Sequence, residues 1–95
     1  LIFVGDFNCP QSHTVFNPIR KMGYLPILTN QKTSLKKECK LDECLASEFD
    51  NIWYNSSKIK TLNAGIIHFY KDFESLLAAR KISDHVPVTV EINLQ

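Results

Sequence analysis

Residues 83–88 have the sequence SDHVPV, and an alternating apolar pattern runs from there to residue 94. Valine, isoleucine and leucine occupy every second position, which is the period of a β-strand with one buried face. We therefore expect a strand over residues 86–94, with Asp84 and His85 immediately before it. Side chains held where a loop meets a buried strand are rigid and yet remain accessible to a ligand.

A second acidic motif, GDFN at residues 5–8, follows an apolar run at the start of the chain. We expect a buried strand over residues 1–4, with Asp6 and Asn8 in the loop that follows it. Asp6 and Asp84 lie near opposite ends of the sequence. They can act together only if a folded sheet brings the ends of nonadjacent strands side by side.

Periodicity and breaker residues predict the other elements. The polar, lysine-rich segment 29–45 predicts a long loop, with a short strand at 33–35 and a helical turn near Asp42. A second polar connection is expected over residues 55–63. The remaining predictions are a helix over 13–22 that starts between 12 and 17, strands over 24–28, 49–54 and 64–70, and a helix of about two turns after an N-cap at Asp72.

Composition describes an ordinary globular domain, with 95 residues of which 44% are hydrophobic and 22% charged. A disordered or fibrous chain is excluded, and no apolar run approaches the ~20 residues that span a bilayer. The net charge of +1 does not indicate an obligate nucleic-acid binder. Four lysines do cluster, but acidic residues interrupt them, which predicts a solvated loop: Lys32, Lys36, Lys37 and Lys40, with Glu38, Asp42 and Glu43 between or beside them.

The segment EFDNIWY at residues 48–54 lies between the two acidic motifs. GDFN, this Phe-Asp-Asn strand and SDHVPV resemble, in that order, the endonuclease/exonuclease/phosphatase superfamily, which includes deoxyribonuclease I and the apurinic/apyrimidinic endonucleases. The resemblance covers nearly the whole chain. It implies half of a four-layer α/β sandwich of the deoxyribonuclease I type, mostly antiparallel sheet with two helices.

The family domain is more than twice this length, so the resemblance implies that residues 1–95 form the C-terminal half of a single domain. The family's earlier half carries a metal-binding Glu, an Asn and a second His or Tyr. The chain also begins inside an apolar run, at residues 1–4. We therefore expect an absent N-terminal half as a partner, negligible activity of the chain alone, and self-association if the chain is isolated.

The resemblance also assigns roles to residues of this chain. His85, with an ordinary pKa of about 6.5, is the expected general base near neutral pH. Asp50 is expected to orient the imidazole, and Asp84 is the first candidate metal ligand. Asp6 is expected to hold the nucleophilic water or to join the cation. Asn8 can donate to a phosphoryl oxygen, because its amide carries both a donor and an acceptor.

Phosphodiester hydrolysis needs positive charge on the phosphoryl oxygens, and a hard cation such as Mg²⁺ or Mn²⁺ with oxygen ligands provides it. DNA is the substrate that we favour, with Thr33 and Ser34 of the long loop as further substrate contacts by analogy. Superfamily relatives also hydrolyse inositol phosphates and sphingomyelin, so a phosphoinositide or sphingomyelin phosphoesterase stays open as an alternative. A catalytically inactive binding or assembly module is the nonenzymatic alternative.

Plainer interpretations exist for each motif. Asp6 and Asn8 are compatible with a simple turn or with the opening of a calcium loop, although Pro10 and Gln11 stand where such a loop needs an acidic ligand and Gly. His85 is compatible with a structural histidine. Two other histidines carry no family motif, and we expect structural or surface roles for them: His13 and His68.

Three cysteines, Cys9, Cys39 and Cys44, cannot all pair within the chain, and their spacing lacks a zinc-site pattern. We expect reduced thiols. Deoxyribonuclease I has a disulfide in comparable regions, and the resemblance therefore leaves a bridge from Cys9 to Cys39 or Cys44 as an alternative.

Overall fold

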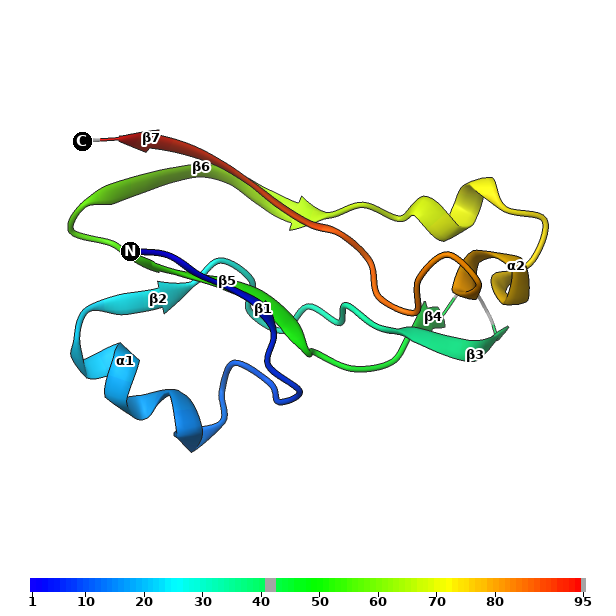
Figure 1. The fold of residues 1–95 in the computed structure, drawn as a ribbon, viewed down its shortest axis with the longest axis horizontal. Coiled ribbons are helices and arrows are strands. Elements are labelled where there is room, and N and C mark those ends of the chain that lie inside the picture. The colour runs from blue at the N-terminus through cyan, green and yellow to red at the C-terminus, as the bar shows by residue number, and fades with distance from the viewer. Residues whose placement is uncertain (41–42, 95) are drawn as a thin grey trace.

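The computed structural model describes residues 1–40 and 43–94, which form a small α/β protein of mostly antiparallel strands with two short α-helices (Figure 1). In chain order the elements are β1 (Phe3–Asp6), the 3-10 helix η1 (Thr14–Phe16), α1 (Asn17–Lys21), β2 (Tyr24–Pro26), β3 (Leu35–Lys40), β4 (Glu43–Leu45), β5 (Asp50–Asn55), β6 (Ile59–Ile66), the 3-10 helix η2 (Phe69–Asp72), α2 (Leu76–Arg80) and β7 (Val88–Leu94).

A three-stranded antiparallel sheet has β5 at its centre, between β1 and β2. Trp53 of β5 is fully buried, and its ring stacks on Phe16 with centroids 4.7 Å apart. Tyr24 completes this cluster of buried aromatic residues. Aromatic side chains bury large apolar areas, so a few of them are enough to fix the sheet against η1 and α1.

The first strand runs from Phe3 to Asp6, two residues later than expected, so Asp6 ends the strand and does not follow it. The expectation that this strand is buried is wrong, because Phe3 is only half-buried and Val4 is 65% exposed. The second strand was expected over 24–28 but ends at Pro26, and one further backbone bond follows, from the Ile27 amide to the Ile52 carbonyl at 2.8 Å. Beyond it, the Leu28 amide donates to Asn51 Oδ1 at 3.0 Å, and Asn51 Nδ2 donates to the Leu28 carbonyl at 2.9 Å. A side-chain amide thus replaces the backbone ladder there.

The helix expected over 13–22 is split. His13 Nδ1 accepts from the Val15 amide at 3.0 Å at the start of η1, and α1 begins only at Asn17. Pro18 lies in the first turn of α1, where its missing N–H costs no hydrogen bond. Gly23 then ends the helical segment with a φ of +90°, a left-handed conformation that glycine adopts without strain.

The antiparallel pair β6–β7 is the second large strand unit, and Figure 1 shows it as a long ribbon that leads to η2. The connection expected over 55–63 is wrong from Ile59 onward, because β6 already begins there. The strand is polar since the pair is largely exposed. Asn63 Nδ2, for example, donates across it to Glu91 Oε2 at 2.9 Å, so β6 lacks the apolar alternation that would have predicted a strand.

The alternating pattern of the final strand is confirmed only in its first part. Val86 is buried, and Val88 and Val90 are half-buried, whereas Thr89 is exposed. The alternation ends at Ile92, whose side chain is 40% exposed. The ladder itself begins at Val88, two residues later than expected.

The strand expected over 64–70 ends at Ile66, and the chain then forms η2 from Phe69 to Asp72. Asp72 closes this 3-10 helix and is not the N-cap of the next helix, contrary to the prediction. Ser75 caps α2, because its Oγ accepts from the Ala78 amide at 3.1 Å. The helix is correspondingly short.

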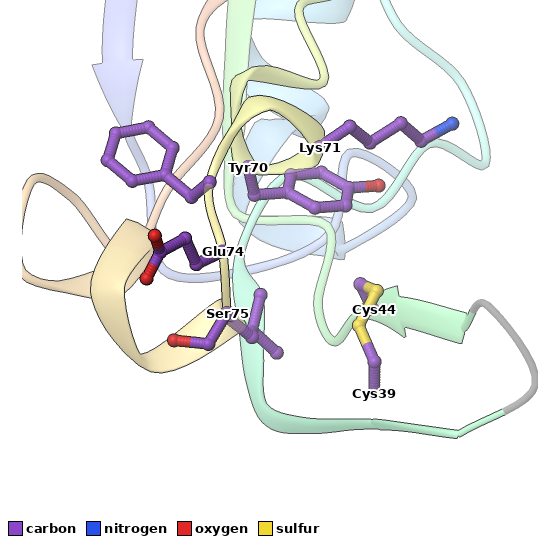
Figure 2. Close-up of a pocket in the computed structure, with 8 residues that line it drawn as sticks. Cys39, Cys44, Tyr70, Lys71, Glu74 and Ser75 are labelled. Carbon is purple, nitrogen blue, oxygen red and sulfur yellow. A yellow bond between two sulfur atoms is a disulfide. The ribbon is translucent and has the colours of Figure 1, made fainter.

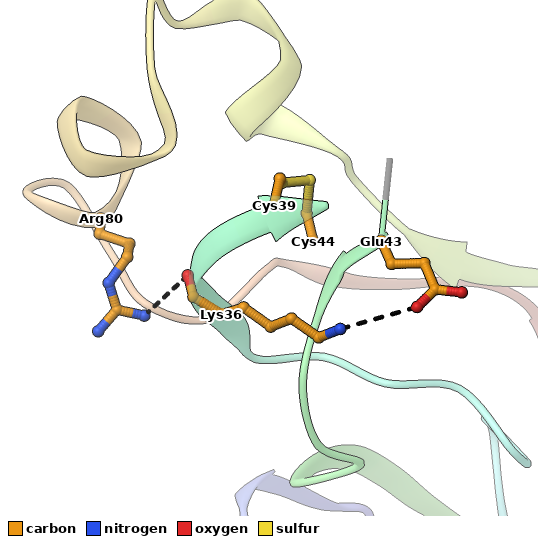
Figure 3. The surroundings of a disulfide bond; sticks show 5 residues. All are labelled: Lys36, Cys39, Glu43, Cys44 and Arg80. Carbon is orange, nitrogen blue, oxygen red and sulfur yellow. Dashed lines mark hydrogen bonds and ion pairs between the residues drawn. A yellow bond between two sulfur atoms is a disulfide. The ribbon is translucent and has the colours of Figure 1, made fainter. Parts of the chain in front are cut away.

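A β-hairpin, β3–β4, occupies most of the segment that was expected to be a loop. The strand predicted over 33–35 overlaps β3 only at Leu35, where β3 begins. Figure 3 shows how the hairpin is held. Arg80 of α2 donates to the Leu35 carbonyl at 2.6 Å and to the Lys36 carbonyl at 3.4 Å, and Lys36 Nζ lies 3.8 Å from Glu43 Oε2. The helical turn expected near Asp42 lies outside the described residues.

A disulfide joins Cys39 of β3 to Cys44 of β4 (Figure 3), so the expectation of reduced thiols is wrong for these two residues. Strand pairing brings their Cα atoms to 4.5 Å, inside the range that a disulfide spans. Cys9 is free, and its Sγ lies 3.3 Å from the Phe7 carbonyl, so the alternative bridges from Cys9 are not formed.

A second buried cluster links the hairpin to α2 and to the segment before β7. It contains Leu35, Tyr70, Ala79 and Val86. Because Val86 directly follows His85, this small core fixes the position of the SDHVPV loop. No helix within the described ranges is long and apolar enough to cross a membrane.

Trp53→Ala should lower the free energy of unfolding by about 3–5 kcal/mol, the usual cost of removing a buried aromatic side chain. Urea denaturation of the purified chain measures this loss. Leu77→Ala is the control, because Leu77 is 68% exposed on α2, and its truncation should change stability by no more than about 0.5 kcal/mol. Equal losses for the two variants would contradict the assigned core.

Candidate functional site

Two of the predicted site carboxylates come from neighbouring strands. Asp6 ends β1 and Asp50 begins β5, and the two residues are partners in the antiparallel register. The Phe7 amide donates to the Phe49 carbonyl at 2.8 Å, which continues the pairing one step past the ladder. The sheet therefore presents both carboxylates at the same end.

The loop that carries Asp84 and His85 is held by the segment before β3. The Leu35 amide donates to the Asp84 carbonyl, and the Val86 amide donates to the Thr33 carbonyl, each at 2.7 Å. Ser34 and His85 consequently form an isolated antiparallel bridge. These backbone bonds leave the His85 ring little freedom to move away from the first sheet.

The His85 ring contacts all three predicted aspartates. Its Nδ1 lies 2.5 Å from Asp50 Oδ2, and since a carboxylate only accepts, Nδ1–H is the donor. Nε2, on the other edge of the ring, lies 3.7 Å from Asp6 Oδ2 and 3.7 Å from Asp84 Oδ1. The structure thus brings together Asp6, Asp50, Asp84 and His85 from both ends and the middle of the sequence.

The hydrogen bond that His85 donates to Asp50 raises the pKa of His85 above its ordinary value of 6.5, and the charges of Asp50, Asp6 and Asp84 add to this effect. Partial burial acts in the opposite direction but is the weaker influence overall. The ring is 28% exposed, whereas the Asp50 side chain is 16% exposed. Asp50 is therefore the more shielded of the two, and Nε2 lies on the side of the more exposed carboxylates of Asp6 and Asp84.

Asn8 belongs to the same turn as Asp6. Its backbone N–H donates to Asp6 Oδ1 at 2.9 Å, which leaves the side-chain amide unused by this bond, and its φ of +55° is a left-handed conformation that asparagine tolerates better than most residues. The Asn8 side chain is exposed. The turn therefore leaves the amide accessible to a ligand near Asp6.

Thr33 and Ser34, the predicted substrate contacts, are both buried, at 0% and 8% exposure. The Thr33 hydroxyl bonds Asp50, and the Ser34 hydroxyl accepts from the Ser47 amide at 3.0 Å. Burial of both hydroxyls argues against direct contact with a substrate. In this structure their partners are protein groups that support the site from within.

Oxygen ligands for a hard cation are present at the outer edge of the site. Asp6 and Asp84 are 41% and 62% exposed, and both flank Nε2 of His85. Asp6, Asp50 and His85 also place ligand atoms within 4.8 Å of one another. Asp84 is not a member of this group. The carboxylates of Asp6 and Asp84 are the more exposed oxygen donors, the ligand type that Mg²⁺ and Mn²⁺ prefer.

One cavity lies against the site carboxylates, and a larger one lies apart from them. One of about 220 Å³ lies between the first sheet and the start of β7, and its lining includes Asp6, Asp50 and Val86. The other, of about 500 Å³, lies between the hairpin and α2 and is lined by the disulfide, Tyr70 and Glu74 (Figure 2). Among the described residues its lining includes none of the predicted site, so the smaller cavity is the one associated with the carboxylates.

Comparison with protein-family models, curated proteins and solved structures returns no match to this chain.

Stability without divalent cations should fall as the pH rises from 6.5 through the higher pKa of folded His85. Between these two values the folded chain binds more protons than the unfolded chain, so a rise in pH favours unfolding. The contribution is complete below 6.5 and is lost above the folded pKa. Urea denaturation across this interval, in a chelator, measures the slope.

His85→Gln should flatten that pH dependence, because glutamine does not titrate. His68→Gln is the matched control, since His68 is an exposed histidine beside η2. A His85→Gln variant with the slope of the wild-type chain would contradict the assigned contacts.

Proposed function

We propose that this chain provides part of the active site of a metal-dependent phosphodiesterase, with DNA as the favoured substrate. The observation that carries the proposal is the His85 ring, bonded by Asp50 on Nδ1 and flanked by Asp6 and Asp84 at Nε2. A largely shielded carboxylate on one nitrogen leaves the other nitrogen to exchange a proton on the side of the exposed carboxylates. This is the arrangement of a general base.

In the proposed mechanism, neutral His85 accepts a proton from water at Nε2. Asp50 fixes the tautomer and stabilises the imidazolium that forms. Asp6 orients the water, and the Asn8 amide donates to a phosphoryl oxygen without adding negative charge. Mg²⁺ or Mn²⁺ held by Asp84 and Asp6 would supply positive charge to the phosphoryl and leaving oxygens.

The finer fold assignment belongs to the same proposal. We infer a half sandwich of the deoxyribonuclease I type, completed by an N-terminal half of the same domain that adds the further cation ligand and phosphate contacts. Several apolar side chains on the strands support a covering partner, because they are 40–65% exposed: Val4, Leu62 and Ile92.

In the complete domain, His85→Ala should lower the rate of Mg²⁺-dependent plasmid nicking by at least about a hundredfold, since removal of a general base costs that much. His68→Ala is the matched control and should keep the wild-type rate. Chelation of the cation should abolish nicking in all variants. Full activity of His85→Ala would remove the proposed base.

The 95-residue chain alone should show negligible nicking, because the proposal assigns further ligands to the other half. Robust nicking by the chain would contradict that part. Parallel assays with RNA, an inositol phosphate and sphingomyelin test the substrate. Hydrolysis of a lipid headgroup but not of DNA would favour the phosphoesterase alternative, and no hydrolysis by the complete domain would favour a binding module.

A further inference from the structure

The hydroxyl of Thr33 has its hydrogen-bonding capacity filled. Its Oγ1 accepts from the Phe49 amide at 3.2 Å and from the Asp50 amide at 2.9 Å, and it donates to Asp50 Oδ2 at 2.6 Å. A hydroxyl has one donor and two acceptor sites. Because two amides occupy the acceptor sites, the single proton has one remaining direction, toward the carboxylate.

The same carboxylate oxygen, Asp50 Oδ2, also accepts from His85 Nδ1. Thr33 and His85 therefore converge on one oxygen atom from different segments of the chain. Thr33 is 0% exposed, so water does not compete for its hydroxyl. In such surroundings a hydrogen bond to a charged acceptor is directional and strong.

The backbone of Thr33 holds the loop that carries His85, the hydrogen-bond partner of Asp50. Its carbonyl accepts from the Val86 amide at 2.7 Å, and its own amide donates to the Ser47 carbonyl at 2.8 Å. One residue thus holds the loop of His85 through its main chain and the carboxylate of Asp50 through its side chain. The position of Thr33 therefore sets the distance between the Asp50 carboxylate and the His85 ring.

We propose that Thr33 is a positioning residue, which fixes the Asp50 carboxylate against His85 Nδ1 by donating a hydrogen bond to the oxygen that the ring shares. The catalytic meaning of this role rests on the proposed function, but the positioning itself does not. Valine has nearly the shape of threonine and no hydroxyl. In Thr33→Val the carboxylate loses its buried donor, and the amides of Phe49 and Asp50 lose their acceptor.

Proton NMR of the metal-free chain at a single pH tests the positioning directly. The Nδ1–H of His85 should give a downfield signal in the wild-type chain, as expected for a donor to a carboxylate. Thr33→Val should shift that signal upfield or lose it by exchange with water, whereas Thr33→Ser should restore it. Ser34→Ala is the matched control, because it removes a hydroxyl from the same segment that bonds Ser47 and not Asp50.

A folded Thr33→Val variant with the unshifted wild-type signal would overturn the proposal, as would equal loss of the signal in Ser34→Ala. If Thr33→Val does not fold, the hydroxyl proton of Thr33 in the wild-type chain decides. A separate, slowly exchanging resonance supports the proposal, and rapid exchange with water overturns it.

In the complete domain, Thr33→Val should lower kcat about tenfold to a hundredfold with little change in KM, as for other groups that orient a reacting residue. Thr33→Ser should recover kcat, and an equal loss in Thr33→Ser would contradict the role of the hydroxyl. The NMR result needs no hydrolysis. Absence of activity in every sample would therefore count against the proposed function. The NMR result would still decide whether Thr33 positions Asp50.

Discussion

The contact between His85 Nδ1 and Asp50 Oδ2 joins parts of the fold that share no strand pairing. Asp50 begins the central strand of the three-stranded sheet, and His85 precedes β7 of a separate pair. Because Asp6 is the register partner of Asp50, the same contact brings the start of the chain to its end. Without this contact, Asp6 and Asp50 would still lie side by side at the end of the first sheet, but no side-chain hydrogen bond would fix the His85 ring against them.

The surrounding structure explains how so short a chain holds that contact. The segment at residues 33–35 bonds the loop of His85 on one side and the start of β5 on the other. The β3–β4 hairpin continues this segment. Arg80 bonds the hairpin to α2, and the disulfide joins its two strands to each other (Figure 3). The described part of the polar stretch between the motifs thus supports the site from within.

Sequence patterns predicted the elements whose residues alternate or bury aromatic groups, such as β5 with Trp53 and the first half of β7. They failed where a strand is polar because it is exposed, as in β6, and where cross-strand partners decide the structure, as for Cys39 and Cys44. The motifs predicted which charged residues meet. Burial of Thr33 could not be predicted, because an isolated threonine in a lysine-rich stretch resembles any loop residue.

We propose that the two acidic motifs form one cation site beside His85. Paramagnetic broadening by Mn²⁺ in the 95-residue chain is the decisive measurement, because the ion broadens the NMR signals of the residues nearest to it. A shared site should broaden the signals of residues 5–8 and 83–85 together, and Asp84→Asn should weaken the broadening in both segments. Broadening confined to one segment, or centred on Glu74 and the cavity beside the disulfide, would contradict it.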